Sequence, residues 1–153
     1  MRIYNPHTNM DTLAVMPASK ASINQRAGRA GRTSPGKCFR LFPESVLDIL
    51  PTSTPPEICR TDISFLVLQL KALGVDNVLR FDFLTPPPSA MLSRALEFLY
   101  NLRALDDQGQ LTRPLGHSMA EMPVDPMLAK ILLDSPNYSC SDEILTMCVA
   151  SLR

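Results

Sequence analysis

Three arginines at three-residue spacing, Arg26, Arg29 and Arg32, are the side chains in this sequence best suited to chemistry. In an α-helix, residues at this spacing lie on one flank, spread over about 120° of arc. Guanidinium groups pair bidentately with phosphate oxygens, which a lysine ammonium does not do. The intervening positions hold only Ala and Gly, so a ligand can approach the backbone closely. The pattern therefore predicts a phosphate-facing helix, and its alternative is an arginine face that is merely solvated.

Gly28 and Gly31 favour the phosphate-facing interpretation. Each glycine costs about 1 kcal/mol relative to Ala in a helix interior, so a plain surface helix gains nothing from them. The role of Gln25 is open at this level. The spacing from Ser22 to Gln25 fits a capping box, in which Gln25 reaches back to the backbone. If Ser19 is the N-cap instead, Gln25 is free to face a ligand.

The stretch at residues 25–32, QRAGRAGR, with the residues 35–42 that follow it, resembles motif VI and its following strand in the DEAH-box RNA helicases of superfamily 2. In that family, two RecA-like domains clamp ATP between them. The resemblance implies that Arg29 and Arg32 are catalytic arginine fingers and that Gln25 places the γ-phosphate or the attacking water. It also implies that Gln25, Gly28, Arg29 and Arg32 bind the nucleotide. Arg26 is either structural or interdomain.

The cofactor implied by the resemblance is ATP with Mg²⁺. The sequence contains no complete G-x-x-x-x-G-K-[ST] phosphate loop and no DEAH tetrapeptide. We therefore expect the nucleotide to be held mainly by domains outside this sequence, with the first RecA-like domain as a partner. The resemblance implies that the enzyme is an NTP hydrolase. The isolated chain is expected to be inactive alone.

The expected fold class is an α/β remnant followed by a mostly α region. Residues 1–50 are interpreted as the end of the second RecA-like domain: a β-hairpin, the motif VI helix, a strand at 37–42 and a helix at 44–50. The strand-like segments 2–4 and 12–16 flank a turn at Asn5 and Pro6. In the family, this hairpin projects toward RNA, which makes Arg2 and His7 weak candidates for RNA contact. The alternative is that His7 is simply a solvated residue of the turn.

The later segments predict a winged-helix domain at residues 51–120. A helix at 62–73 carries apolar residues on most faces, as a buried helix does. A second helix at 89–102 and two short strands at 104–112 around a glycine turn complete the module. Helices at 126–133 and 141–152 indicate the start of a helical ratchet domain, incomplete at 121–153. A RecA-like sheet cannot be completed from three strands and one helix, so apolar residues near the N-terminus should be exposed.

Charge is distributed unevenly along the chain. Residues 1–40 carry seven Lys or Arg and one acidic residue, whereas the rest carries eight basic and fourteen acidic residues. The basic part is therefore expected to bind anions. The four cysteines form no C-x-x-C pair, so neither a metal site nor a disulfide framework is expected. No apolar run is long enough to span a membrane, and an intracellular protein is expected.

Two functions compete. The first is part of an ATP-dependent RNA helicase that couples NTP hydrolysis to RNA unwinding or RNP remodelling. The resemblance then implies RNA as a partner, a nuclear location, and spliceosomal or ribosome-assembly factors as further partners. The alternative is a non-catalytic truncated protein that acts as a winged-helix interaction module. A free-standing DNA-binding winged helix is disfavoured because the chain is acidic after residue 40.

Overall fold

The computed structural model describes residues 1–6, 8 and 10–151. In chain order its elements are β1 (Arg2–Asn5), β2 (Met10–Leu13), α1 (Lys20–Ala27), η1 (Gly28–Gly31), α2 (Glu44–Ile49), η2 (Glu57–Cys59), α3 (Ser64–Ala72), η3 (Val78–Arg80), α4 (Ser89–Asn101), α5 (Leu115–Glu121), α6 (Pro126–Asp134), η4 (Ser135–Tyr138) and α7 (Ser141–Ser151). The η elements are 3₁₀ helices. The mostly helical character expected from the sequence is confirmed.

The N-terminal hairpin is antiparallel, with Arg2 opposite Leu13 and Tyr4 opposite Asp11. Its first strand is one residue longer than predicted, and its second strand lies at 10–13 instead of 12–16, because β2 ends at Leu13 and the chain then leaves toward α1. Every residue of β2 is exposed, whereas Tyr4 on β1 is buried. His7, a candidate for RNA contact, lies outside the described residues.

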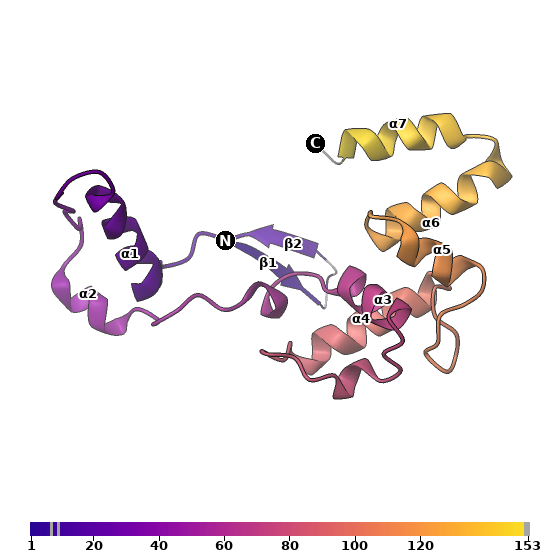
Figure 1. The fold of residues 1–153 in the computed structure, drawn as a ribbon, viewed down its shortest axis with the longest axis horizontal. Helices are drawn as coiled ribbons and strands as arrows, with labels where there is room; N and C mark the ends of the chain where they lie inside the picture. Colours follow the sequence, from indigo (N-terminus) through magenta and orange to yellow (C-terminus); the bar gives the residue numbers. More distant parts are fainter. Residues whose placement is uncertain (7, 9, 152–153) are drawn as a thin grey trace.

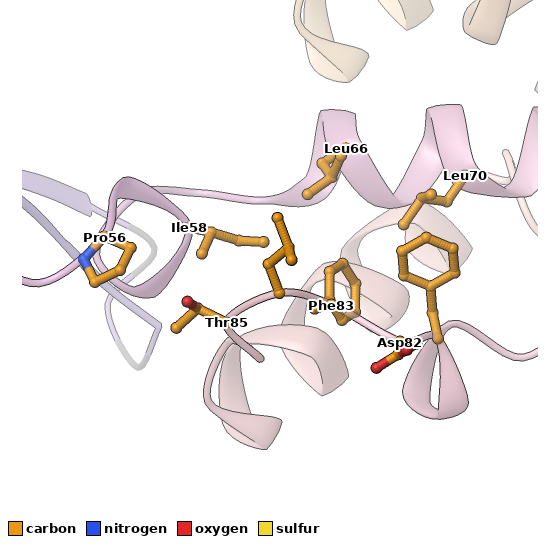
Figure 2. A pocket seen from close by; sticks show the side chains of 9 residues that line it. Pro56, Ile58, Leu66, Leu70, Asp82, Phe83 and Thr85 are labelled. Carbon is orange, nitrogen blue, oxygen red and sulfur yellow. The ribbon is translucent and has the colours of Figure 1, made fainter.

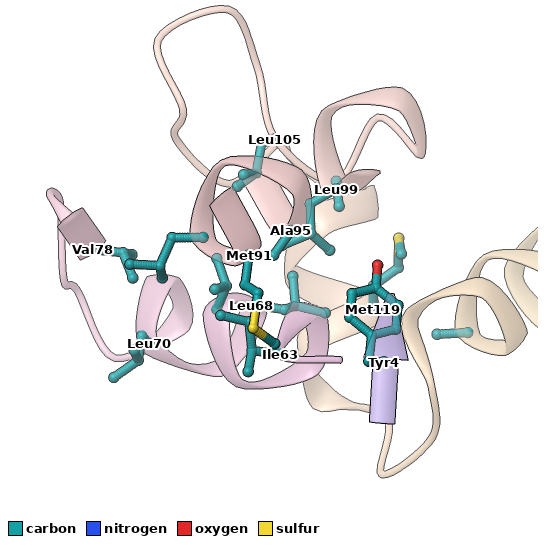
Figure 3. Close-up of a cluster of buried hydrophobic side chains, with 14 residues drawn as sticks. Tyr4, Ile63, Leu68, Leu70, Val78, Met91, Ala95, Leu99, Leu105 and Met119 are labelled. Atoms are coloured by element: carbon teal, nitrogen blue, oxygen red, sulfur yellow. The ribbon is translucent and has the colours of Figure 1, made fainter. Parts of the chain in front are cut away.

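One hydrophobic core joins α3, α4 and α5 (Figure 3). Leu68, Leu99 and Met119, one from each helix, are the largest of its completely buried side chains. The helix expected at 62–73 forms as α3, but it is not buried all round, since Phe65 and Leu73 are 40% and 80% exposed. Its other face packs on α4, which is sufficient to stabilise it.

The wing is reduced to a single antiparallel bridge between Leu105 and Leu111, so the two predicted strands are not formed. The Asp106 carboxylate holds the turn of the wing by accepting hydrogen bonds from the backbone N–H groups of Gln108 and Gln110. Gly109 completes the turn with φ of +69°. Backbone hydrogen bonds from the Asp106 N–H to Gln110 and from the Thr112 N–H to Ala104 lie on either side of the bridge.

An apolar groove of about 630 Å³ runs along the outer side of the winged helix (Figure 2). The side chains that line it come from η2, α3 and the residues after η3: Pro56, Ile58, Leu66, Leu70, Phe81, Asp82, Phe83, Leu84 and Thr85. Phe81 and Phe83 meet edge to face, with ring centroids 4.8 Å apart. This contact orders the loop that forms one wall of the groove.

The two helices predicted after residue 121 form as α6 and α7. Asp125 caps α6 by accepting a hydrogen bond from the Met127 N–H, and Pro126 occupies the first helical position. This is the arrangement that capping chemistry favours, because Pro has no N–H to satisfy there. Figure 1 shows α7 turning back above α6.

The segment that contains α1, η1 and α2 stands apart from these helices (Figure 1). The strand predicted at residues 37–42 is wrong as a paired strand, since in the part of the chain that the structure describes no strand lies beside it. The expected exposure of apolar residues before residue 50 is confirmed. The exposed side chains are Met10, Leu13, Val15, Met16, Phe39, Leu41 and Ile49.

Candidate functional site

The arginine helix, defined here as α1, η1 and Arg32, begins at Ser19. The Ser19 Oγ accepts a hydrogen bond from the Ser22 N–H at 3.2 Å, and the Ser19 carbonyl accepts one from Ile23 N–H. Ser19 is therefore the N-cap, and the alternative in which Gln25 closes a capping box with Ser22 is wrong. Ser22 lies inside the helix, so Gln25 is left exposed on its surface.

The helix tightens from α to 3₁₀ geometry at Gly28, whose N–H reaches the carbonyls of both Asn24 and Arg26. A 3₁₀ helix has three residues per turn, so residues three apart eclipse one another. Arg32 keeps helical backbone angles beyond the last 3₁₀ residue. Arg29 and Arg32 are consequently aligned more closely than the roughly 60° that separates residues three apart in an α-helix. Gly28 and Gly31 form a parallel stripe without side chains.

The two glycines face open space. A Cβ built on Gly28 or Gly31 meets nothing within 4 Å. Gln25, Arg29 and Arg32 are exposed. Within the part of the chain that the structure describes, neither Arg29 nor Arg32 makes an ion pair. The site thus presents two unneutralised guanidinium groups beside a bare backbone, which suits a ligand that carries phosphate.

Residues 35–40 fold back along the arginine helix and support it. A Cβ at Gly36 would lie 2.1 Å from the Ala30 carbonyl oxygen, so only glycine allows this approach. Further along, Arg40 donates a hydrogen bond of 2.9 Å to the Asn24 side chain. Sequence reasoning missed both contacts. The only signal was the Pro35–Gly36 pair, which indicated a helix stop but not what the following segment packs against.

The start of α1 is held by the residues that follow α2. The N–H groups of Lys20 and Ala21 donate to the carbonyls of Pro51 and Thr52 at 2.9 and 3.0 Å. Arg26 lines a cavity of about 490 Å³ between α1 and residues 51–55, which fits the structural or interdomain alternative for this residue. The N-terminal N–H groups of α1 thus have partners in the chain, and the candidate site lies at the other end.

The structure makes Arg2 a less favoured candidate for RNA contact. Arg2 forms an ion pair with Asp11 across the hairpin, so part of its charge is neutralised, although its side chain is 68% exposed. Among residues 1–6, 8 and 10–151, no three His, Cys, Asp or Glu side chains gather where a metal ion could bind. No helix in the described part of the chain is both long and apolar enough to cross a membrane.

Comparison with known proteins finds a matching domain family and similar proteins. Residues 95–124 match the model of the helicase associated domain (HA2), winged-helix. The chain is also similar to the human protein described as probable ATP-dependent RNA helicase DHX35 and to its orangutan (Pongo abelii) counterpart. It is 54% identical to each over 147 residues, which is 96% of this chain. The same alignment covers 21% of the human relative and 20% of the orangutan relative, so the chain spans about a fifth of their length.

Proposed function

The chain is homologous over almost its whole length to a segment of the DEAH-box RNA helicases, and from this premise we propose that it is a functional part of such an enzyme. The observation that carries the proposal is the arginine helix, exposed and unneutralised, within a sequence 54% identical to relatives named ATP-dependent RNA helicases. The proposed activity couples NTP hydrolysis to RNA unwinding or RNP remodelling. The proposed partners are RNA and the first RecA-like domain.

Arg29 and Arg32 are proposed as the arginine fingers. Bound ATP supplies the phosphoryl group for hydrolysis, and its transfer spreads negative charge over oxygens that guanidinium groups stabilise. Gly28 and Gly31 leave the space for a phosphate-bearing ligand to approach the helix. Gln25, one turn before Arg29, holds the terminal phosphate or the attacking water. Mg²⁺ is proposed to be held by other parts of the enzyme.

The proposal is tested by replacing the fingers in the full-length helicase. Arg29→Ala and Arg32→Ala should each lower kcat for ATP hydrolysis on the order of 10³-fold, the loss typical of a removed arginine finger. Both substitutions should leave thermal unfolding of the 153-residue chain unchanged, since neither arginine has an ion-pair partner in its described part. Arg103→Ala is the matched control, because Arg103 is equally exposed but lies at the base of the wing.

A kcat within about threefold of wild type for both finger variants would contradict this assignment. A second measurement addresses the isolated chain, which is proposed to lack ATPase activity of its own. Turnover by the purified 153-residue chain that disappears with Arg29→Ala would show that the nucleotide is held here after all.

The alternative function, a winged-helix interaction module without catalysis, is favoured by one observation. The hydrophobic core is made almost entirely from residues after Arg60 and contains no side chain of the arginine helix. The size of the native protein in its own cells distinguishes the two functions. A species several times larger than 16.9 kDa supports the helicase proposal, and a stable species at 16.9 kDa supports the module.

A nuclear location and association with spliceosomal or ribosome-assembly factors belong to the helicase proposal. Imaging tests the location, and co-purification tests the association.

A further inference from the structure

Tyr4 anchors the β1–β2 hairpin to the winged-helix core. Only 9% of Tyr4 is exposed, and among the described residues it is the one buried member of the core cluster that precedes residue 60. Figure 3 shows its ring entering the core from the hairpin, near Met119 of α5. The neighbouring strand β2 contributes nothing to this core, since all four of its residues are exposed.

The backbone of β1 is held at the same place. The Tyr4 N–H donates to the Arg60 carbonyl at 2.7 Å, and the Arg60 guanidinium donates back to the Arg2 carbonyl at 3.3 Å. Arg60 stands four residues before α3, so these two bonds attach the hairpin to the entry of the winged helix. Hydrogen bonds that involve a guanidinium are stronger than those between neutral groups.

The Tyr4 hydroxyl meets α4. The Arg94 guanidinium donates a hydrogen bond to it, and Asp62 lies close enough to act on its charge. Arg94 also pairs with Glu97 at 2.9 Å on the same helix. Beside them, Pro6 at the hairpin turn faces Ser93, Arg94 and Glu97 across a small cavity. Tyr4 and Pro6 thus bring one end of the hairpin beside α4.

The arginine helix is attached elsewhere. Its N-terminal residues bond to residues 51–54, which link α2 to η2. The hairpin leads to it through residues 14–19, and Met1 lines the same cavity as Ser22 and Arg26. Figure 1 shows the hairpin lying between the two groups of helices. Adjacency in sequence groups the hairpin with the arginine helix, whereas the buried ring of Tyr4 and the bonds to Arg60 attach it to the winged-helix core.

We propose that Tyr4 and Arg94 are positioning residues that make the hairpin part of the winged-helix domain, so that the hairpin moves with α4 and not with the arginine helix. A force on the hairpin tip is then transmitted to α4 through a buried ring and a charge-assisted hydrogen bond. This inference concerns contacts within the chain and does not rest on the proposed function.

Hydrogen–deuterium exchange of the 153-residue chain tests the coupling. Tyr4→Ala should speed exchange by at least about tenfold both in the hairpin and in α4, because the opening of one releases the other. Leu13→Ala is the matched control, since Leu13 is an apolar hairpin residue that is 84% exposed. It should leave both regions within about threefold of wild type. Tyr4→Phe keeps the buried ring but loses the hydroxyl that Arg94 bonds, so it should speed hairpin exchange about two- to tenfold.

A second variant keeps the test decisive if Tyr4→Ala unfolds the chain. Arg94→Met retains the aliphatic bulk but not the hydrogen bond, and it should speed hairpin exchange about two- to tenfold without changing exchange in α6 and α7. A general effect of lost helix stability would appear in all of these helices. Hairpin exchange that stays at the wild-type rate in Arg94→Met, or α4 exchange that stays there in a folded Tyr4→Ala chain, would overturn the proposal.

Discussion

Gly116 is the residue whose replacement by Ala most directly tests the packing of the winged helix. It lies in the first turn of α5, where its N–H donates to Thr112 Oγ1 at 3.0 Å. A Cβ added there would lie 2.2 Å from the Ala104 carbonyl oxygen and 3.0 Å from Thr112 Oγ1. The carbonyl belongs to the backbone and accepts the Thr112 N–H, so it cannot move without breaking that bond.

The change in the free energy of unfolding caused by Gly116→Ala is the balance of opposing contributions. Ala is favoured over Gly in a helix by at most about 1 kcal/mol. Forcing α5 away from the wing costs about 1–3 kcal/mol in overpacking. Loss of the hydrogen bond from Thr112 to Ala104 adds about 0.5–1.5 kcal/mol. The free energy of unfolding should therefore fall by about 0.5–4.5 kcal/mol, which lowers Tm by about 1–18 °C for a chain of this size.

Thermal unfolding followed by circular dichroism at the helix band measures this, and the chain contains its own control. Gly28→Ala makes the same chemical change in a helical backbone where nothing lies within 4 Å of the new methyl group. It should leave Tm unchanged or raise it slightly, since only the helix preference for Ala remains. If Gly116→Ala unfolds at or above the wild-type temperature, the close approach of α5 to the wing is not the constraint we infer.

Two further predictions concern backbone strain and pH. Arg103, just after α4, has φ of +61°, a left-handed conformation that costs a non-glycine residue about 1–2 kcal/mol. Arg103→Gly should therefore raise Tm by a few degrees in the same thermal assay. A lower Tm would contradict this. Burial, with a smaller effect from Asp62, raises the pKa of Tyr4 above its ordinary value of 10.0. The stability that depends on the neutral phenol is therefore complete below about pH 10 and is lost as pH rises through the higher folded-state pKa. Between pH 9 and about pH 11, the fall in Tm should be smaller for Tyr4→Phe than for wild type. Equal falls would show that the Tyr4 hydroxyl is not linked to folding.

Much of the candidate site followed from local pattern. The spacing of Arg26, Arg29 and Arg32 placed them on one helix, and the glycines between them indicated an open backbone. The structure bears out that openness at Gly28 and Gly31. The catalytic roles of Arg29, Arg32 and Gln25 remain predictions, since geometry shows what is accessible and not which ligand binds. The change to 3₁₀ geometry was missed because propensity distinguishes helix from loop but not the number of residues per turn.

The sequence alone determined the order of the winged-helix elements, because apolar periodicity, prolines and glycines act over a few residues and are visible in one segment at a time. Only the tertiary structure decided where those elements meet. Tyr4 contacts Arg60 and Arg94, Gly36 lies against Ala30, and Gly116 lies against Ala104. Each contact joins residues whose spacing follows no helical or strand period. They arise when packed backbones approach one another, and that geometry leaves no repeating signal in the chain.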